Sequence, residues 1–189
     1  MNLVHHWLCS SALWRGVLER DILPWVLEGI SLGGDLLELG PGPGMTTALL
    51  QARAPRLTAV EKDFGLASRL ADRPTNAHVR VIQGDATALP LADATFTSAA
   101  SFTMLHHLPY PALQDRMFRE ACRVLRPGGT FFGTDAVNSR TMRLLHLADT
   151  LTPIDPAALP ARLKAAGFRD IAIDVRPGRF RFRAIARKA

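Results

Sequence analysis

The stretch from residue 36 to residue 47, LLELGPGPGMTT, constrains the fold more than any other part of the chain. Leu36, Leu37 and Leu39 have the character of a short buried strand, three glycines follow within five residues, and a helix-compatible run begins at Thr46. Glycine has no Cβ atom, so these positions allow left-handed backbone and let a ligand lie against the main chain. Free N–H groups at the start of the helix favour a polar or anionic ligand group. The stretch therefore predicts a strand, a tight turn and a helix, with a ligand bound at the turn.

The spacing of the glycines narrows the choice of ligand. The turn has the pattern GxGxG rather than the dinucleotide pattern GxGxxG, and Glu38 would repel a pyrophosphate but suit a cation. The run from Glu38 through Gly40, Pro41 and Gly42 to Gly44 matches E/D-x-G-x-G-x-G at all four fixed positions. In this it resembles the first motif of the class I S-adenosylmethionine-dependent methyltransferases, and within them the type 11, UbiE-like group that acts on small molecules.

Two further acidic residues follow predicted strands. Glu61 ends the strand at 57–60 and lies 21 residues beyond Gly40, where a carboxylate can accept hydrogen bonds from both ribose hydroxyls. Asp85 follows the strand at 79–82 in the same way. Because the carboxyl ends of parallel strands meet at one edge of a sheet, we expect Glu38, Glu61 and Asp85 to lie at that edge.

The resemblance implies a role for each of these positions. S-adenosyl-L-methionine would be the cofactor and S-adenosyl-L-homocysteine the product. Asp85 and Ala86 would recognise the adenine, and Lys62 and Ser101 would join the cofactor-binding residues.

The rest of the chain predicts one α/β domain over residues 1–189. We expect a Rossmann-like, doubly wound sheet of seven strands, mostly parallel with an antiparallel C-terminal strand, and helices on both faces. Residues 1–30 would form a helical lead-in, and residues 135–167 a segment that shapes the substrate pocket. Further strands are predicted at 96–102, after the turn at 127–129, and in a hairpin with its turn at 177–178; helices are predicted at 3–22, 24–28, 64–71 and 111–125.

Composition and charge exclude several classes of protein. No apolar run approaches the ~20 residues of a membrane span, and the start of the chain has no basic and apolar leader, so we expect a cytoplasmic protein. Cys9 and Cys122 are too few for a disulfide framework, and no histidine or cysteine group has metal-ligand spacing, so we expect reduced cysteines and no metal. The net charge of +6 arises in residues 160–189, which hold nine basic and two acidic residues; a solvated basic face explains this better than a nucleic-acid partner.

The expected reaction is in-line displacement, in which a nucleophile of the acceptor attacks the sulfonium methyl group and the protein mainly holds the two reactants aligned. A base is needed only for an acceptor that must lose a proton. His106 or His107, after the fourth strand, could serve as that base at neutral pH, although either could equally form a pocket wall.

Two other functions stay open. The motifs also resemble those of rRNA adenine dimethyltransferases, but this chain has Ser101-Phe102-Thr103-Met104 where such enzymes carry an Asn- or Asp-Pro-aromatic motif. A protein that binds the methyl donor without catalysis has the same sequence pattern. The sequence disfavours a nicotinamide dehydrogenase; it leaves open the acceptor, the atom methylated, and whether the protein is a monomer or a homodimer.

Overall fold

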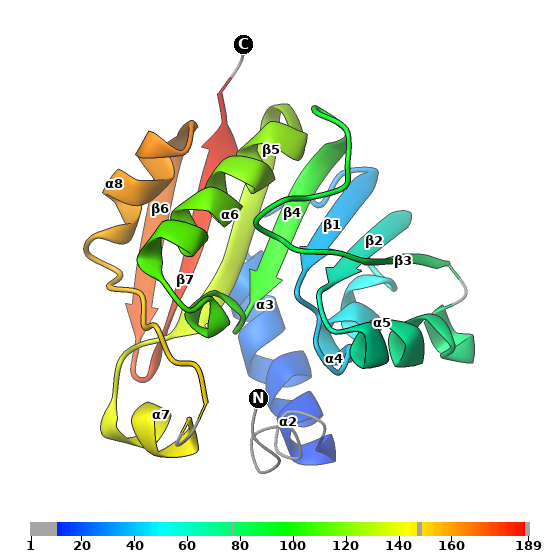
Figure 1. The fold of residues 1–189 in the computed structure, drawn as a ribbon, viewed down its shortest axis with the longest axis horizontal. Helices are drawn as coiled ribbons and strands as arrows, with labels where there is room; N and C mark the ends of the chain where they lie inside the picture. Colours follow the sequence, from blue (N-terminus) through cyan, green and yellow to red (C-terminus); the bar gives the residue numbers. More distant parts are fainter. Residues whose placement is uncertain (1–10, 77, 147–148, 188–189) are drawn as a thin grey trace.

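A computed structural model describes residues 11–76, 78–146 and 149–187. Its centre is one seven-stranded sheet (Figure 1). Across the sheet the strands follow the order β3 (Val79–Gln83), β2 (Arg56–Glu61), β1 (Asp35–Leu39), β4 (Phe96–Phe102), β5 (Leu125–Ala136), β7 (Arg179–Ala186) and β6 (Phe168–Arg176).

The strand directions confirm the predicted topology. The strands from β3 to β5 pair in parallel, whereas β7 is antiparallel to both β5 and β6. Strand β1 pairs with β2 on one side and β4 on the other, so the chain reverses its direction of travel across the sheet between β1 and β4. In open α/β sheets, ligands bind at the carboxyl ends of the strands beside such a reversal.

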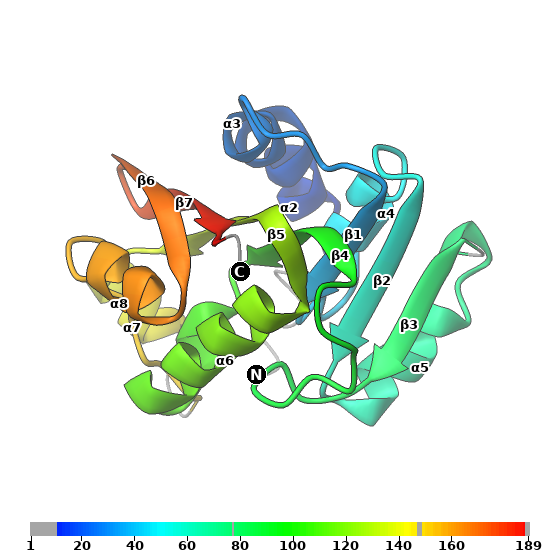
Figure 2. The same ribbon diagram turned by 90° about the horizontal axis from the view of Figure 1, so that it is seen from above.

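Helices cover both faces of the sheet (Figure 2). Figure 2 shows α6 and α8 below the sheet and α2 and α3 above it. The helical elements are α2 (Ala12–Val17), the π-helical η1 (Leu18–Ile22), α3 (Leu23–Leu27), α4 (Met45–Leu50), α5 (Phe64–Ala71), α6 (Pro111–Val124), α7 (Arg140–Leu145) and α8 (Leu159–Ala165), with 3-10 turns η2 (Pro74–Asn76) and η3 (Leu105–His107).

Two apolar cores result, one on each face. Neighbouring residues of a strand point to opposite faces, so Phe131 packs in the core under α6 and α8, and Phe132 packs in the core under η1 and α3. Leu37 and Leu36 of β1 divide in the same way. This double burial explains why the central strands read as continuous apolar runs rather than as alternating ones.

The boundaries differ from expectation at two places. Strand β5 begins at Leu125, before the predicted turn, because Leu125 pairs with Phe96 and the turn with Gly128 at φ 82° forms an irregularity inside the strand. The lead-in helix is described only from Ala12 onward and has a π-helical turn; His5, His6, Cys9 and Leu147 lie outside the described residues.

The expectations about membrane spans and about Cys122 can be compared with the structure. Within the described part of the chain, no helix is long and apolar enough to cross a membrane. Burial raises the pKa of the free Cys122 thiol, which favours the structural role predicted for that residue.

Candidate active site

The glycine turn joins β1 to α4. Gly40, Gly42 and Gly44 all have positive φ angles, of 63°, 55° and 79°. A Cβ atom on Gly40 would lie 2.4 Å from Cγ of Met104, whereas one on Gly42 would meet nothing within 4 Å. Gly40 is therefore needed for close packing against the loop after β4, and Gly42 leaves open space above the turn.

Glu38 holds this turn from below. Its carboxyl group is 1% exposed and accepts hydrogen bonds from the hydroxyls of Thr46 and Thr47, the latter at 2.6 Å. Burial raises the pKa of Glu38 to about 7, against the lowering effect of the two hydroxyls and with a smaller raising effect from Glu61. The side chain ties β1 to the first turn of α4.

Glu61 lies at the end of β2, directly beside the glycine turn. One carboxylate oxygen accepts the N–H of Gly42 at 2.9 Å and the other accepts the N–H of Asp63 at 2.9 Å. Each oxygen keeps a second lone pair, so the carboxylate can still accept two hydroxyl groups. The two backbone bonds hold it in one orientation.

Asp85 begins the loop after β3. One of its oxygens accepts the N–H and the hydroxyl of Thr87, both at 2.8 Å, and the other lies 2.8 Å from Nζ of Lys62. Burial raises the pKa of Asp85, but the bonds from Lys62 and Thr87 outweigh it and leave that pKa below its ordinary value. Asp85 is therefore ionised at neutral pH.

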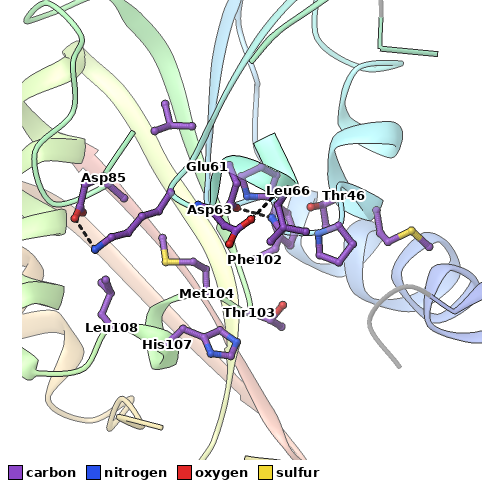
Figure 3. Close-up of a pocket in the computed structure, with 18 of the residues that line it drawn as sticks. Thr46, Glu61, Asp63, Leu66, Asp85, Phe102, Thr103, Met104, His107 and Leu108 are labelled. Carbon is purple, nitrogen blue, oxygen red and sulfur yellow. Dashed lines mark hydrogen bonds and ion pairs between the residues drawn. The ribbon is translucent and has the colours of Figure 1, made fainter. Parts of the chain in front are cut away.

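These strand ends surround a cavity of about 580 Å³ (Figure 3). This is within the usual range for small-molecule sites, which is about 300–1,000 Å³. Figure 3 shows Glu61 and Asp85 around the same opening as Met104 and His107. The wall is completed by apolar side chains of Trp14, Leu18, Leu66, Phe102 and Leu108, and by Asp149 and Thr150 from the predicted pocket segment.

The structure brings most of the predicted site residues to this cavity. Those that line it are Gly40, Pro41, Gly42, Glu61, Lys62, Asp85, Ala86 and His107. Glu38, Gly44, Ser101 and His106 are not among the lining residues. Gly44 caps α4 in the left-handed conformation, and Ser101 is fully buried in β4. The structure places these four residues outside the cavity lining. Contact with a ligand stays a prediction for all of the predicted site residues.

The two predicted histidines differ sharply in environment. His106 is 2% exposed, and its Nδ1 lies 2.5 Å from a carboxylate oxygen of Asp135, which is itself 1% exposed. The other oxygen of Asp135 accepts the backbone N–H of His106 at 3.2 Å. His107 is half-buried and lines the cavity.

Sequence reasoning missed Asp135 and Thr103. Asp135 lies near the end of β5, and its pairing with His106 joins residues 29 positions apart; an acid at one more strand end was its only local signal. Thr103 lines the cavity with φ at 50°, a conformation that is unusual for a β-branched residue. No local pattern marks it.

Comparison with known proteins agrees with this geometry. The family model described as "Methyltransferase domain" matches residues 37–133. Malonyl-[acyl-carrier protein] O-methyltransferase of Methylococcus capsulatus is 31% identical over 176 residues, which are 84% of this chain and 62% of that protein. Ribosomal RNA small subunit methyltransferase A of Methylibium petroleiphilum is 40% identical over 78 residues, which are 41% of this chain and 29% of that protein. The chain thus spans less than two thirds of the length of either relative.

A solved structure of a protein from Pyrococcus horikoshii shares the fold, with a TM-score of 0.82 at 17% identity over 96% of this chain and 97% of that one. The fold and the cavity define a Rossmann-like α/β protein with a cavity at the carboxyl ends of the strands, beside the reversal of the sheet. With the match to the family model over half of its length, the chain belongs to the class I S-adenosylmethionine-dependent methyltransferases.

Proposed function

We propose that this protein transfers a methyl group from S-adenosyl-L-methionine to a small-molecule or lipid-like acceptor by in-line displacement. The observation that carries the proposal is the shared cavity, in which the glycine turn, Glu61 and Asp85 lie together with an apolar wall. When bound, S-adenosylmethionine supplies an electrophilic methyl group on a sulfonium cation, and S-adenosyl-L-homocysteine is left after transfer.

The residues present fit this cofactor. Glu61 has two remaining lone pairs for the ribose hydroxyls, and the open space above Gly42 admits a ligand close to the backbone. We assign Asp85 and Ala86 to the adenine, since both line the cavity; Lys62 forms an ion pair with Asp85. The lining residues include the four acids Glu61, Asp63, Asp85 and Asp149 and the base Lys62, a balance that favours a cationic ligand over a pyrophosphate.

The acceptor would occupy the part of the cavity near Met104, His107 and Leu108, opposite Asp149 and Thr150. Positioning of the two reactants supplies most of the acceleration in such a reaction, and no covalent nucleophile from the protein is needed. Of the two histidines predicted as bases, His107 lines the cavity, so we propose that it contacts the acceptor and takes the proton of an acceptor hydroxyl. His106 packs beside His107 as a buried neighbour, and the centroids of the two rings are 4.1 Å apart.

A small acceptor is favoured over RNA by the segment after β4. The rRNA methyltransferase aligns with this chain over 78 residues at 40% identity, but the described cavity has Thr103 and Met104 where an Asn- or Asp-Pro-aromatic motif would hold a flipped base. Tyr110, the nearest aromatic residue after a proline, is 65% exposed and lies outside the cavity lining. The relative that matches 84% of this chain is named malonyl-[acyl-carrier protein] O-methyltransferase, which supports an oxygen acceptor. A cytoplasmic location stays a prediction from the sequence.

The proposal is tested first by cofactor binding. At a hundredfold excess over Kd, S-adenosylmethionine or S-adenosylhomocysteine should stabilise the protein by ~2.7 kcal/mol, measured as a rise in Tm. Glu61→Ala should largely abolish that rise. No rise for the wild type, or a full rise for Glu61→Ala, would show that the site is assigned wrongly.

A pair of glycine variants separates binding from folding. Gly42 and Gly178 both have positive φ, at 55° and 83°, and a Cβ atom on either meets nothing within 4 Å. Alanine should therefore destabilise the free protein similarly at both sites, by about 1 kcal/mol. Only Gly42→Ala should weaken S-adenosylmethionine binding, because only Gly42 lines the cavity. Methyl transfer to acceptors that carry a hydroxyl or carboxyl group then distinguishes an enzyme from a protein that only binds the cofactor.

A further inference from the structure

Three histidines meet beside the cavity. His106 and His107 belong to η3 and His146 follows α7, and one nitrogen from each lies within 4.8 Å of the others. The ring centroid of His146 is 4.9 Å from that of His106 and 5.3 Å from that of His107. His106 and His146 are buried, and His107 is half-buried at the cavity wall.

Hydrogen bonds at Nδ1 orient two of these rings. Nδ1 of His106 faces Asp135 at 2.5 Å, and Nδ1 of His146 lies 2.8 Å from the carbonyl oxygen of Met142. A carboxylate or a carbonyl on the far nitrogen is the usual support of a metal-bound histidine, because it holds the tautomer that leaves the other nitrogen as a ligand. Asp135 is held in turn by the N–H of Ala136 at 2.6 Å.

The remaining nitrogen of His106 gives an independent indication. Its Nε2 is buried and has no hydrogen-bond partner among the described residues. Leaving a buried polar atom unsatisfied is unfavourable, so such atoms in native proteins call for an explanation. A cation bound by the imidazoles would satisfy it.

We propose that His106, His107 and His146 bind one divalent transition-metal ion, for which Zn²⁺ is the natural probe. Three neutral imidazoles suit zinc, and a set of three protein ligands leaves a fourth coordination position open. Zn–N bonds of about 2.0–2.1 Å would bring the nitrogens, which now lie within 4.8 Å of one another, to about 3.3 Å, so the rings must move closer by up to about 1.5 Å. His146 is about 40 positions away from the other two ligands, so no local spacing in the sequence indicates a metal site.

The ion would lie at the wall of the cavity, where it could contact the acceptor. His107 belongs to both the cluster and the cavity, so the open position could take an oxygen of the acceptor. That use rests on the proposed function, whereas the binding of the ion does not. The ion would occupy a nitrogen of His107. His107 can therefore either bind the metal ion or accept the proton of the acceptor, but it cannot do both at once.

Metal binding is tested on the full chain after removal of metals with a chelator. Titration with Zn²⁺, and with Co²⁺ for its visible absorption, should give one ion per chain and a Co²⁺ spectrum of low-coordinate nitrogen ligation. His107→Ala and His146→Ala should each weaken binding by about tenfold or more, and Asp135→Asn by about ten- to hundredfold. His78→Ala, which changes an exposed histidine far from the cluster in sequence, is the control and should bind as the wild type does.

Two further measurements make the result decisive. Tm of each metal-free variant shows whether it is folded, and His107, being half-buried, is the ligand whose loss disturbs packing least. A His5→Ala/His6→Ala variant should also bind as the wild type does. The proposal is overturned if neither ion binds stoichiometrically, if folded His107→Ala binds with wild-type affinity, or if only the His5/His6 variant loses binding. The cofactor-induced rise in Tm, measured on the same metal-free samples, tests the proposed function separately.

Discussion

Glu38 is a buried acid whose pKa should affect the stability of the protein. Its pKa rises from 4.5 to about 7 on folding, mainly through burial, so the folded state holds the proton more tightly than the unfolded chain does. The stabilisation from this group is complete below pH 4.5 and is lost as the pH rises through about 7. At one pKa unit per about 1.4 kcal/mol, the loss is about 3 kcal/mol.

Glu38→Gln should remove this loss, because an amide cannot ionise. We expect a flatter free energy of unfolding between pH 4.5 and 7 than in the wild type, measured by urea denaturation across that range. Glu19→Gln removes the same formal charge from an exposed position and should keep the wild-type slope. If Glu38→Gln shows that slope as well, the carboxyl group is ionised throughout.

At the level of the elements, side chains of α6 hold the loop between β3 and β4 in position. It carries Asp85 into the cavity and is held by α6 at its middle. Arg123 donates to the carbonyl oxygens of Leu91 at 2.8 Å and Leu89 at 3.1 Å, and Glu120 accepts the N–H of Leu89 at 2.7 Å. A hydrogen bond from Arg123 holds the pKa of Glu120 below its usual range, so the pair is ionised.

Arg123→Met should loosen this loop while keeping most of the apolar packing of α6. We expect S-adenosylmethionine to bind about 5- to 30-fold more weakly, since the lost bonds to charged and carbonyl groups are together worth about 1–2 kcal/mol at the site. Isothermal titration calorimetry measures this change. Arg119→Met, on an exposed position of the same helix, should bind as the wild type does; equal losses in both variants would show that helix charge matters rather than the loop.

At the scale of the whole molecule, the two ends of the described chain meet on one face. Trp25 of α3 donates from Nε1 to Asp174 of β6 at 3.0 Å. Arg181 of β7 donates to the carbonyl oxygen of Trp25 and pairs with Glu28 at 2.9 Å and Asp174 at 3.1 Å. The sequence predicted a solvated basic face for the arginines of the C-terminal hairpin. In the structure, Arg181 of this hairpin instead forms ion pairs within the fold. The helices that they hold also supply Trp14 and Leu18 to the cavity wall.

Arg181→Ala should therefore lower the free energy of unfolding by about 1–3 kcal/mol, because it removes the hydrogen bond to the partly buried carbonyl oxygen of Trp25 and the ion pairs with Glu28 and Asp174. Urea denaturation measures this loss. Arg183→Ala, two residues along the same strand at an exposed position, should change stability by less than about 0.5 kcal/mol. Equal effects would mean that the pairing of Arg181 contributes nothing to docking of the helices.

Much of the fold could be predicted because its signals are local. Helix α5 and strand β4 have the predicted bounds, since a period of 3.6 or a run of small apolar residues is visible in any short window. The start of β5 could not be predicted, because Leu125 joins the strand through its pairing with Phe96 rather than through its own neighbours.

Local sequence was enough to predict the strand, turn and helix at LLELGPGPGMTT and the positions of Glu61 and Asp85 at strand ends. Both follow from backbone sterics and from the direction of parallel strands. Three contacts emerge only in the folded chain: Glu38 faces α4 rather than the cavity, Asp135 holds His106, and His146 joins His106 and His107. These contacts join residues on different elements, and the partner of a side chain across a core depends on how the helices pack on the sheet, so no short stretch of sequence reveals them.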